Sequence, residues 1–294
     1  MKRALYFQPP FVGTPEFADW TKRAATARKK LLESNPPYTF NEKIWKDFKN
    51  EFLVPLGRCM YCEGRYAGGH FDDAEHYRPK NSVTENRIEV HHGYYWLVYE
   101  WHNLLLACKK CNSSHPDRWR LQEKASQLGK LCEFPITGKR VTKPSADPDR
   151  WEEELEAEGA LLLHPYYDPP DKHFVARAGG FIASLSDQGE FTIKVCDLNR
   201  KELCDDRLVA EKNVKSKAND LWHKNPMGQL DWEREKYSRE DAFATYLNCK
   251  VKEEIDRLMK KMSQTFGNAS EPPPPGPHPA PRPARRKPRA SRLR

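Results

Sequence analysis

The spacing of apolar residues predicts two helices at the start of the chain. A first helix is expected from Thr14, whose hydroxyl can cap it, to about Ser34. A second begins after Asn41 and ends at Pro55. Its apolar residues recur at helical spacing and are interpreted as core, not as a surface that stacks on bases: Ile44, Trp45, Phe48 and Phe52.

Short apolar runs in the middle of the chain predict strands. The run Leu104–Ala107 is interpreted as a buried strand, followed by a helix that starts near Cys108, passes through His115 and stops at Pro116. A hairpin-rich β region with a turn at 186–189 is expected further on, with its strands at 161–163, 174–176, 181–183 and 191–195. Helical patterns return at 199–222 and 238–262, so the chain is predicted to be α+β.

Four of the eight cysteines form two Cys-x-x-Cys pairs, Cys59–Cys62 and Cys108–Cys111, which stand 45 residues apart. Two such pairs can place four thiolates on one structural zinc ion, each at roughly 2.3 Å. Disulfides, buried thiols and a redox pair are the alternatives. The first residues lack the apolar core of a signal peptide, which predicts a cytoplasmic protein, where paired cysteines bind metal more often than they form disulfides.

Charge separates a nearly neutral body from a basic end. Residues 271–294 hold seven Arg or Lys, one acid and nine of the 24 prolines, so they carry +6 of the formal charge of +8. This segment has no aromatic residue to bury and is expected to be disordered. It either contacts a phosphate backbone or is a solvated extension that aids solubility. No run approaches the roughly 18 apolar residues of a membrane span, which predicts a soluble protein.

Glu75 and His76 lie between the cysteine pairs and are not needed by the zinc. Phosphodiester hydrolysis with one metal ion needs a base for water and an ion that stabilises negative charge. His76 is the candidate base, and Glu75 is a hard oxygen ligand for Mg²⁺ or Mn²⁺. Neighbours in a regular strand face opposite sides, so a loop or a twisted strand end is expected here. Asn112 can offer its carbonyl oxygen to the same ion.

Three further side chains near this pair each have more than one interpretation. His115 lies one helical turn after Asn112 and is either another ligand of the divalent ion, a phosphate contact, or a capping or solvated residue. Arg78 and Lys80 follow His76 closely. They either grip phosphates near the scissile bond, which we favour, or form a solvated loop.

The order Cys-x-x-Cys, Glu-His-x-x-Pro, Asn-Leu and Cys-x-x-Cys-Asn resembles that of the HNH endonucleases, whose active unit is the ββα-metal fold. The resemblance implies that His76 is the general base and that Glu75 and Asn112 hold a divalent ion. It also implies that Asn103 supports the catalytic loop. The third motif position is Asn, which makes this an His-Asn-Asn variant. Glu75 stands where many members have Asp, and the stretch between the cysteine pairs is long.

A narrower similarity covers roughly residues 50 to 210. The segments 75–80 and 93–106 are similar to those of HNH nucleases from Septu-type and retron anti-phage systems. Three short matches fit the same group: Phe134-Pro135, Leu163-His164-Pro165 and Leu198-Asn199-Arg200. The similarity implies an ATPase partner of the ABC type and, in retrons, also a reverse transcriptase with its RNA–DNA product.

Four parts are predicted from these features: an N-terminal helical part (1–54), a zinc-braced ββα-metal unit (55–135), a β-hairpin and helical C-terminal region (136–265), and a disordered basic, proline-rich tail (266–294). We interpret the chain as a metal-dependent HNH endonuclease that acts in anti-phage defence, with double-stranded DNA as the expected substrate. The alternative is a four-cysteine zinc module that binds nucleic acid or a partner protein without catalysis. Such a module needs neither a base nor a second metal.

Overall fold

The computed structural model of the protein describes most of the chain, namely residues 5–65, 72–113, 115–116, 127–145, 151–224, 237 and 243–267. The chain divides into two compact units, one up to Ile255 and one from Asp256 onward. The predicted boundaries at 54 and 135 fall inside the first unit and stay predictions, and the predicted tail lies outside the described residues from 268 onward. No helix in the described ranges is both long and apolar enough to cross a membrane.

Side-chain caps start both N-terminal helices where the sequence predicted. The Thr14 hydroxyl accepts a hydrogen bond from the Phe17 N–H at 3.2 Å and starts α1 (Pro15–Leu32). The Asn41 side chain caps α2 (Glu42–Phe48) in the same way. The prediction that Pro55 ends this helix is wrong. The run continues through a π-helical turn, η1 (Lys49–Leu53), and a 3₁₀ turn, η2 (Val54–Leu56), and ends at Gly57 with φ 72°.

The apolar residues of α2 and η1 are core, as predicted. Ile44, Trp45, Phe48 and Phe52 are all buried. The Trp20 indole N–H donates to the Ile44 carbonyl at 2.9 Å, and the Trp20 ring lies 4.4 Å from that of Phe48, so α1 is fixed onto α2. Burying each large apolar side chain contributes about 1.5–3 kcal/mol, which makes this cluster the anchor of the N-terminal helices.

An antiparallel pair of strands occupies the middle of the first unit. β1 (Asp72–His76) pairs with β4 (Leu104–Cys108), so that Glu75 lies opposite Leu105 and His76 opposite Leu104. The buried strand predicted at 104–107 is therefore confirmed. A hairpin, β2 (Val83–Glu85) and β3 (Ile88–His91), and two 3₁₀ turns, η3 (Tyr95–Leu97) and η4 (Trp101–Asn103), lie between them.

The helix after β4 is shorter than predicted. α3 (Lys109–Asn112) makes one turn and ends at Ser113, whose backbone is extended (φ −90°, ψ 155°). His115 and Pro116 then form β5 (His115–Pro116), which pairs with β6 (Gln127–Leu128). The predicted helix through His115 is wrong because a residue before proline is biased towards extended backbone.

The described part of the C-terminal region contains one hairpin where more strands were predicted. β7 (Phe174–Ala176) pairs with β8 (Ile182–Ser184), which confirms that hairpin, but residues 161–163 form no strand. The predicted strand at 191–195 is wrong: this segment belongs to α5 (Asp187–Val195), and the supposed turn is its cap, where the Ser186 hydroxyl accepts from the Gly189 N–H at 3.0 Å. The remaining elements are α4 (Trp151–Glu156), η5 (Pro170–Lys172), η6 (Ala178–Gly180), α6 (Lys201–Glu211), α7 (Val214–Lys224) and α9 (Ala244–Gly267).

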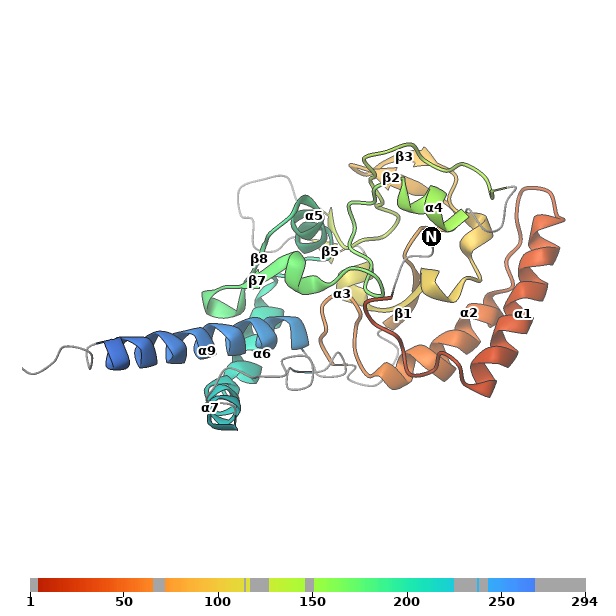
Figure 1. Cartoon of the computed structure of the whole chain (residues 1–294). Helices are drawn as coiled ribbons and strands as arrows, with labels where there is room; N and C mark the ends of the chain where they lie inside the picture. The colour runs from red at the N-terminus through yellow and green to blue at the C-terminus, as the bar shows by residue number, and fades with distance from the viewer. Residues whose placement is uncertain are drawn as a thin grey trace, which may run out of the picture. The chain divides into compact units, whose positions relative to one another are not determined.

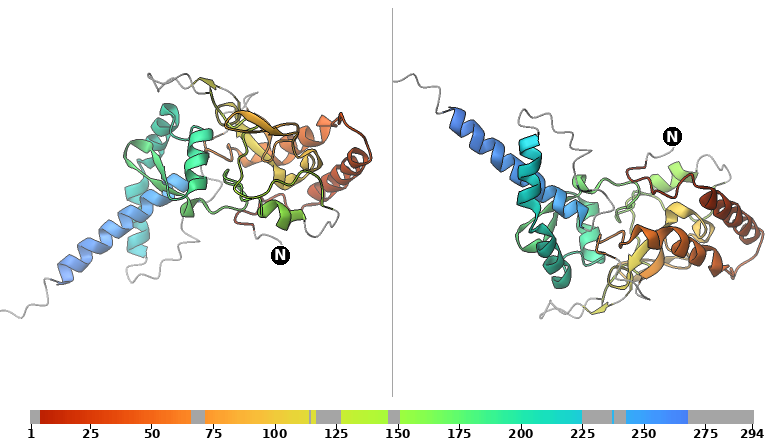
Figure 2. Two further views of the ribbon diagram at one scale, coloured as in Figure 1. Left: turned by 90° about the horizontal axis from the view of Figure 1, so that it is seen from above. Right: turned by 90° about the horizontal axis from the view of Figure 1, so that it is seen from below.

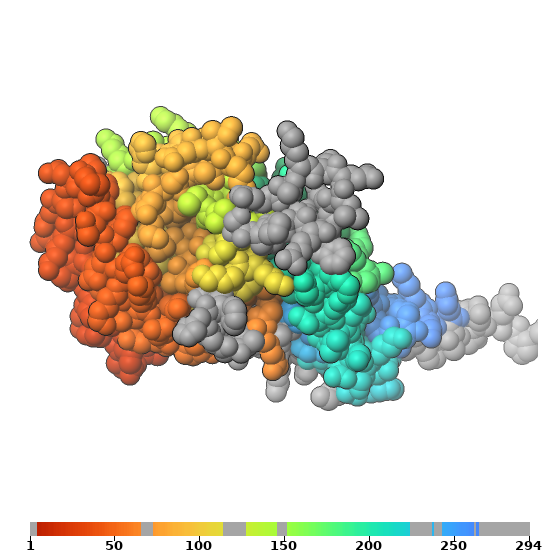
Figure 3. Space-filling model, turned by 180° about the vertical axis from the view of Figure 1, so that it is seen from behind, coloured from red at the N-terminus to blue at the C-terminus, as the bar shows by residue number. Residues whose placement is uncertain are grey.

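Within the first unit, β1 and α3 lie between two groups of helices. α1 and α2 cover one side, and α5 and α6 lie on the other (Figure 1, Figure 2). Seen from behind, the orange surface of the N-terminal helices borders the light orange and yellow surface of the segments around β1 and α3 (Figure 3). The mixed arrangement of short hairpins and helices confirms the α+β class.

Candidate functional site

The four cysteines of the two pairs meet in one cluster. The sulfur atoms of Cys59, Cys62, Cys108 and Cys111 all lie within 4.8 Å of one another, and Cys62 Sγ is 3.9 Å from Cys108 Sγ. Four sulfurs at roughly 2.3 Å from a tetrahedral zinc ion stand about 3.8 Å apart, so the cluster fits structural zinc. All eight cysteines carry free thiols, which excludes the disulfide alternative in this structure.

Backbone hydrogen bonds bring the two cysteine pairs together. The first pair follows η2, and the Met60 N–H donates to the Leu106 carbonyl of β4 at 2.8 Å. The second pair spans the junction of β4 and α3. Hydrogen bonds from the neighbouring thiols of Cys108 and Cys111 hold the pKa of Cys62 well below its usual range. Zinc in this cluster would clamp the start of α3 to the segment after η2.

Arg200 completes the surroundings of the cysteine cluster, and the spacing of the cysteines gave no sign of it. Its guanidinium is buried, with Nη1 3.6 Å from Cys111 Sγ and Nη2 3.9 Å from Cys108 Sγ. Burial lowers the pKa of Arg200, but the thiolates of Cys111, Cys62 and Cys108 outweigh this and raise the pKa above its usual range. Four thiolates and one Zn²⁺ leave an excess of negative charge, which this cation offsets.

Replacing Arg200 by methionine is expected to weaken zinc binding by about 10–100-fold, as for other groups that support metal ligands. The affinity is measured by competition with a chelating dye. Arg177→Met, at an exposed arginine of the same C-terminal region, is the control and should leave the affinity unchanged. Equal zinc affinity in both variants would show that Arg200 does not stabilise the thiolates.

Glu75 and His76 border a cleft of about 420 Å³ that is separate from the cysteine cluster. The cleft lies between α2, β1, the loop after β1 and α3, and its lining includes Glu75, His76 and Asn112. Glu75 and His76 both belong to β1, so a loop is not required. His76 is the last residue of the strand, and at this strand end both residues reach the same cleft.

The His76 imidazole is held in one orientation and is uncharged. Its Nε2 lies 3.1 Å from the Val98 carbonyl. A carbonyl only accepts, so Nε2 carries the hydrogen and Nδ1 keeps its lone pair. Burial lowers the pKa of His76 to about 3, to which the positive charge of Lys80 adds. The Trp45 ring packs against the imidazole at 5.3 Å between centroids. His76 is therefore uncharged near physiological pH, with the lone pair of Nδ1 available.

Asn103 fastens the loop that follows His76. Its side-chain oxygen accepts from the Arg78 N–H at 2.8 Å, and its Nδ2 donates to the carbonyls of Arg78 and Leu97, each at 3.2 Å. The Tyr77 N–H donates to the Asn103 carbonyl at 2.9 Å. Asn103 itself is 2% exposed, so its side chain makes these bonds from inside the protein. They tie the end of β1 to the segment that carries the Val98 carbonyl.

Lys130 is a buried cation beside the candidate centre that the sequence did not reveal. Its ammonium is ion-paired with Glu75 Oε1 and donates to the His76 carbonyl at 3.1 Å. Its backbone N–H donates to the Cys111 carbonyl at 2.8 Å, which docks this segment onto α3. Burial raises the pKa of Glu75, and the charge of Lys130 opposes that rise. One carboxylate oxygen of Glu75 thus already has a cationic partner.

Asn112 presents an unused oxygen near two carboxylates. Its Nδ2 donates to Asp73 Oδ2 at 3.1 Å, whereas its Oδ1 is buried without a hydrogen-bond partner in the described part of the chain. Asp73, which the sequence reasoning missed, also pairs with Lys109 at 2.5 Å. Carboxylate and amide oxygens suit Mg²⁺ or Mn²⁺, and Mg²⁺ usually takes few protein ligands and keeps several waters. Asp73, Glu75 and Asn112 all line the cleft, and their side-chain oxygens are of the kind that such an ion takes.

Arg78, Lys80 and His115 have different surroundings in the structure. The Arg78 guanidinium is used internally: Nε lies 3.1 Å from Glu158 Oε2, and Nη2 donates to the Leu155 carbonyl at 2.7 Å. We therefore do not assign a phosphate contact to Arg78. Lys80 lines the cleft, with its Nζ 5.2 Å from the centre of the Trp45 ring. His115 lies in β5, and its side chain is outside the described residues.

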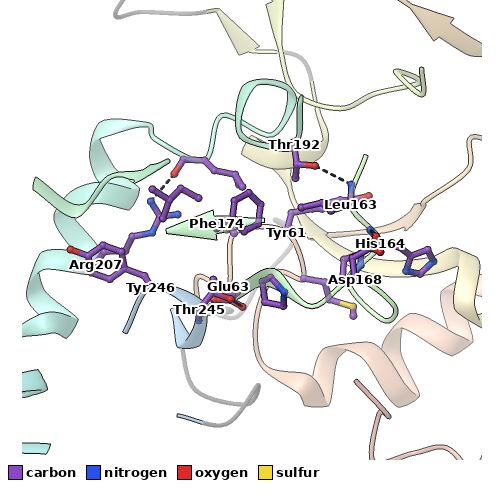
Figure 4. Close-up of a pocket in the computed structure, with 16 residues that line it drawn as sticks. Tyr61, Glu63, Leu163, His164, Asp168, Phe174, Thr192, Arg207, Thr245 and Tyr246 are labelled. Atoms are coloured by element: carbon purple, nitrogen blue, oxygen red, sulfur yellow. Dashed lines mark hydrogen bonds between the residues drawn. The ribbon is translucent and has the colours of Figure 1, made fainter. Parts of the chain in front are cut away.

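A second cavity lies beside the first cysteine pair, and hydrogen bonds that join separate segments of the chain form its walls (Figure 4). Its volume is about 50 Å³, enough for a few water molecules and too small for a nucleotide. The Leu163 N–H donates to the Thr192 hydroxyl at 3.0 Å on one wall. On another, the Glu63 carboxylate accepts from the Thr245 N–H at 2.9 Å at the start of α9. The cleft at the end of β1 is the candidate functional site because Glu75, His76 and Asn112 all line it.

Comparison with known proteins finds two similar chains. The Septu protein PtuB of Bacillus mycoides (strain KBAB4) is 32% identical over 203 residues, which are 67% of this chain and 61% of PtuB. The Septu protein PtuA of the same strain is 31% identical over 190 residues, which are 64% of this chain and 22% of PtuA. The matches thus span less than two thirds of PtuB and about a fifth of PtuA. No protein-family profile and no solved structure matches the chain.

These relatives confirm the similarity to Septu proteins that the motifs indicated. They do not name a nuclease. The chemistry of the cleft therefore has to be argued from its own residues.

Proposed function

We propose that this chain is a metal-dependent endonuclease of the HNH type that hydrolyses phosphodiester bonds of double-stranded DNA within a Septu-like anti-phage defence system. The observation that carries the proposal is the cleft at the end of β1. It combines a neutral histidine whose Nδ1 carries a lone pair with an amide oxygen that has no hydrogen-bond partner among the described residues, and two carboxylates line the same cleft. A binding module has no use for that combination, which disfavours the non-catalytic alternative.

In this proposal His76 Nδ1 takes the proton from the attacking water. The Val98 carbonyl keeps the imidazole oriented and stabilises the positive charge that it acquires. The pKa of about 3 describes the protein without substrate, and a negatively charged phosphate in the cleft raises the basicity of His76. Asn103 holds the loop that positions the imidazole. Lys80 contacts a phosphate next to the scissile bond.

Two metal ions have different roles in this proposal. Zinc on the four cysteines is structural, because four thiolates leave no open position for chemistry. Mg²⁺ or Mn²⁺, held by Asn112 with Glu75 and Asp73, would stabilise the charge on the phosphate and the leaving oxygen. Lys130 keeps Glu75 in place and partly neutralised, so the ion would share this carboxylate with an ammonium group.

Incubation of the purified chain with plasmid DNA tests the nuclease directly. Cleavage is expected with Mg²⁺ or Mn²⁺ and should stop when a chelator removes the divalent ion. A parallel incubation with RNA of the same sequence tests the proposed preference for DNA. Intact plasmid under all conditions, with the partner protein present, would favour the four-cysteine binding module.

We also propose an ATPase of the ABC type as partner. The segment similar to this chain is a minor part of PtuA, so in that protein it is joined to a much longer sequence. Segments joined in one protein commonly associate when they occur as separate chains. Both relatives carry the Septu name, which favours this partner over a retron reverse transcriptase.

The tagged chain, expressed in its native host, is expected to copurify with an ATPase and to cut DNA faster with that partner than alone. Residues 1–270 carry a net charge of only +2, so their own electrostatic attraction to DNA is weak. The measurement is a pull-down followed by cleavage assays of both preparations. Vigorous cleavage by the isolated chain, with no ATPase recovered, would refute the partner while leaving the nuclease intact.

A further inference from the structure

Two lysines in the cleft come from outside the segment that carries the cysteines and the candidate catalytic residues. Lys46, on α2, and Lys49, the first residue of η1, line the cleft together with Lys80. Lys46 and Lys49 are three residues apart and therefore lie on the same side of the helical run. The opposite side of this run carries the core residues Ile44 and Phe48, so its orientation is fixed by burial.

The charges of these lysines are available to a ligand. The two carboxylates of the cleft already have cationic partners, since Glu75 pairs with Lys130 and Asp73 with Lys109. Lys46 forms a 2.6 Å pair with Glu42, but the two side chains are 62% and 59% exposed. Exposed pairs of this kind contribute about 0–1 kcal/mol, so a phosphate can replace the carboxylate readily. The cleft therefore presents a positive wall opposite His76.

We propose that α2 and η1 form one wall of the nucleic-acid track, and that Lys46 and Lys49 bind backbone phosphates flanking the scissile bond. The inference rests on the proposed nuclease function and assigns a substrate-binding role to the N-terminal helices. Phosphate contacts carry no sequence information, but they fix the register of the strand. Lys80, which follows β1 and reaches the Trp45 ring of α2, and the two helical lysines then hold the strand with the scissile phosphate at His76.

DNA binding by the Lys46→Gln/Lys49→Gln double variant tests this wall. Both it and its reference carry His76→Ala, so that cleavage does not interfere, and the affinity for a labelled duplex is measured at several salt concentrations. The double variant is expected to bind more weakly, by on the order of tenfold for each contact at 0.1 M salt, and the log–log salt slope should fall by about 0.9 per contact. Zinc content and helicity should stay unchanged.

Lys43 provides a matched control on the same helix. Its side chain is 76% exposed and pairs with Asp47 four residues away, as Lys46 pairs with Glu42. It lines a different groove, between α1 and α2. Lys43→Gln in the same background should retain the affinity and the salt slope.

An unchanged slope in the double variant, or an equal loss in Lys43→Gln, would overturn the proposed wall. A nuclease that cuts plasmid DNA but shows either result keeps its function and loses this binding surface. A protein that binds DNA through the wall but never cuts it, with metal and partner present, keeps the surface and loses the proposed catalysis. The two proposals therefore fail separately.

Discussion

Replacing His76 by alanine is expected to abolish DNA cleavage while zinc content, fold and DNA binding stay near normal. The side chain lies next to the candidate metal ligand Glu75. Its Nε2 donates to the Val98 carbonyl, so Nδ1 is the ring atom that can accept a proton. Loss of a general base typically lowers the rate by about 10²–10⁴-fold, which corresponds to about 3–5 kcal/mol in the activation barrier. The measurement is the rate of plasmid cleavage at saturating Mg²⁺ or Mn²⁺.

His76→Asn is the companion variant, because the asparagine amide keeps a polar side chain at this position but cannot act as a base. It should be as inactive as His76→Ala and should fold better, since it leaves less of the space beside Trp45 unfilled. His92→Ala, at a histidine whose side chain is 98% exposed, is the neutral control. Full activity in His76→Asn would refute the assignment of His76 as the base.

A pH series of the unfolding free energy gives a second readout of the same side chain. The pKa of His76 is lowered from 6.5 to about 3 in the folded protein, so the unfolded state binds more protons between these values. The part of the unfolding free energy that is linked to His76 is therefore fully present above about pH 6.5 and is lost as the pH falls towards 3. His76→Asn lacks this group and should lose less stability over that interval than the wild type.

Single Cys→Ser substitutions in the cysteine cluster are expected to unfold the central unit. Structural zinc contributes an apparent 10–16 kcal/mol, roughly, to small metal-built units, whereas whole domains are stable by only about 5–15 kcal/mol. Loss of one ligand therefore removes a large share of the total stability. Metal analysis of the wild type should return about one tightly bound zinc per chain. The substitutions are made at Cys59, Cys62, Cys108 and Cys111.

Cys249→Ser is the control for these variants, because Cys249 is partly buried on α9 and is not part of the cluster. It should keep one zinc per chain and should unfold at nearly the wild-type temperature. Thermal unfolding followed by circular dichroism compares all five variants. A wild-type chain that is folded but free of zinc, even after purification with added zinc, would refute the structural metal site.

Local features of the sequence determined several parts of this fold. The caps at Thr14 and Asn41 start two helices because a side chain satisfies backbone donors within three residues. The apolar run of β4 becomes a buried strand. The segment 191–195 was predicted as a strand and is part of a helix that starts at the Ser186 cap, because a short apolar run is compatible with either element. The two Cys-x-x-Cys pairs predicted that their four sulfur atoms lie together, because this spacing is typical of a shared metal site.

Only the tertiary structure decided which charged groups surround the two candidate sites. Lys130 pairs with Glu75 across 55 residues, Arg200 reaches Cys111 across 89, and Arg78 bonds Glu158 across 80. No spacing rule predicts such pairs, because their partners are set by how distant segments pack. A cation that is buried by that packing is stable only when it is paired with an anion or with carbonyl oxygens, and the packing decides which of these lie within reach. For that reason the sequence indicated His76 and the four cysteines, whereas only the fold placed Lys130 beside Glu75 and Arg200 beside the cysteine sulfurs, and bonded Arg78 to Glu158.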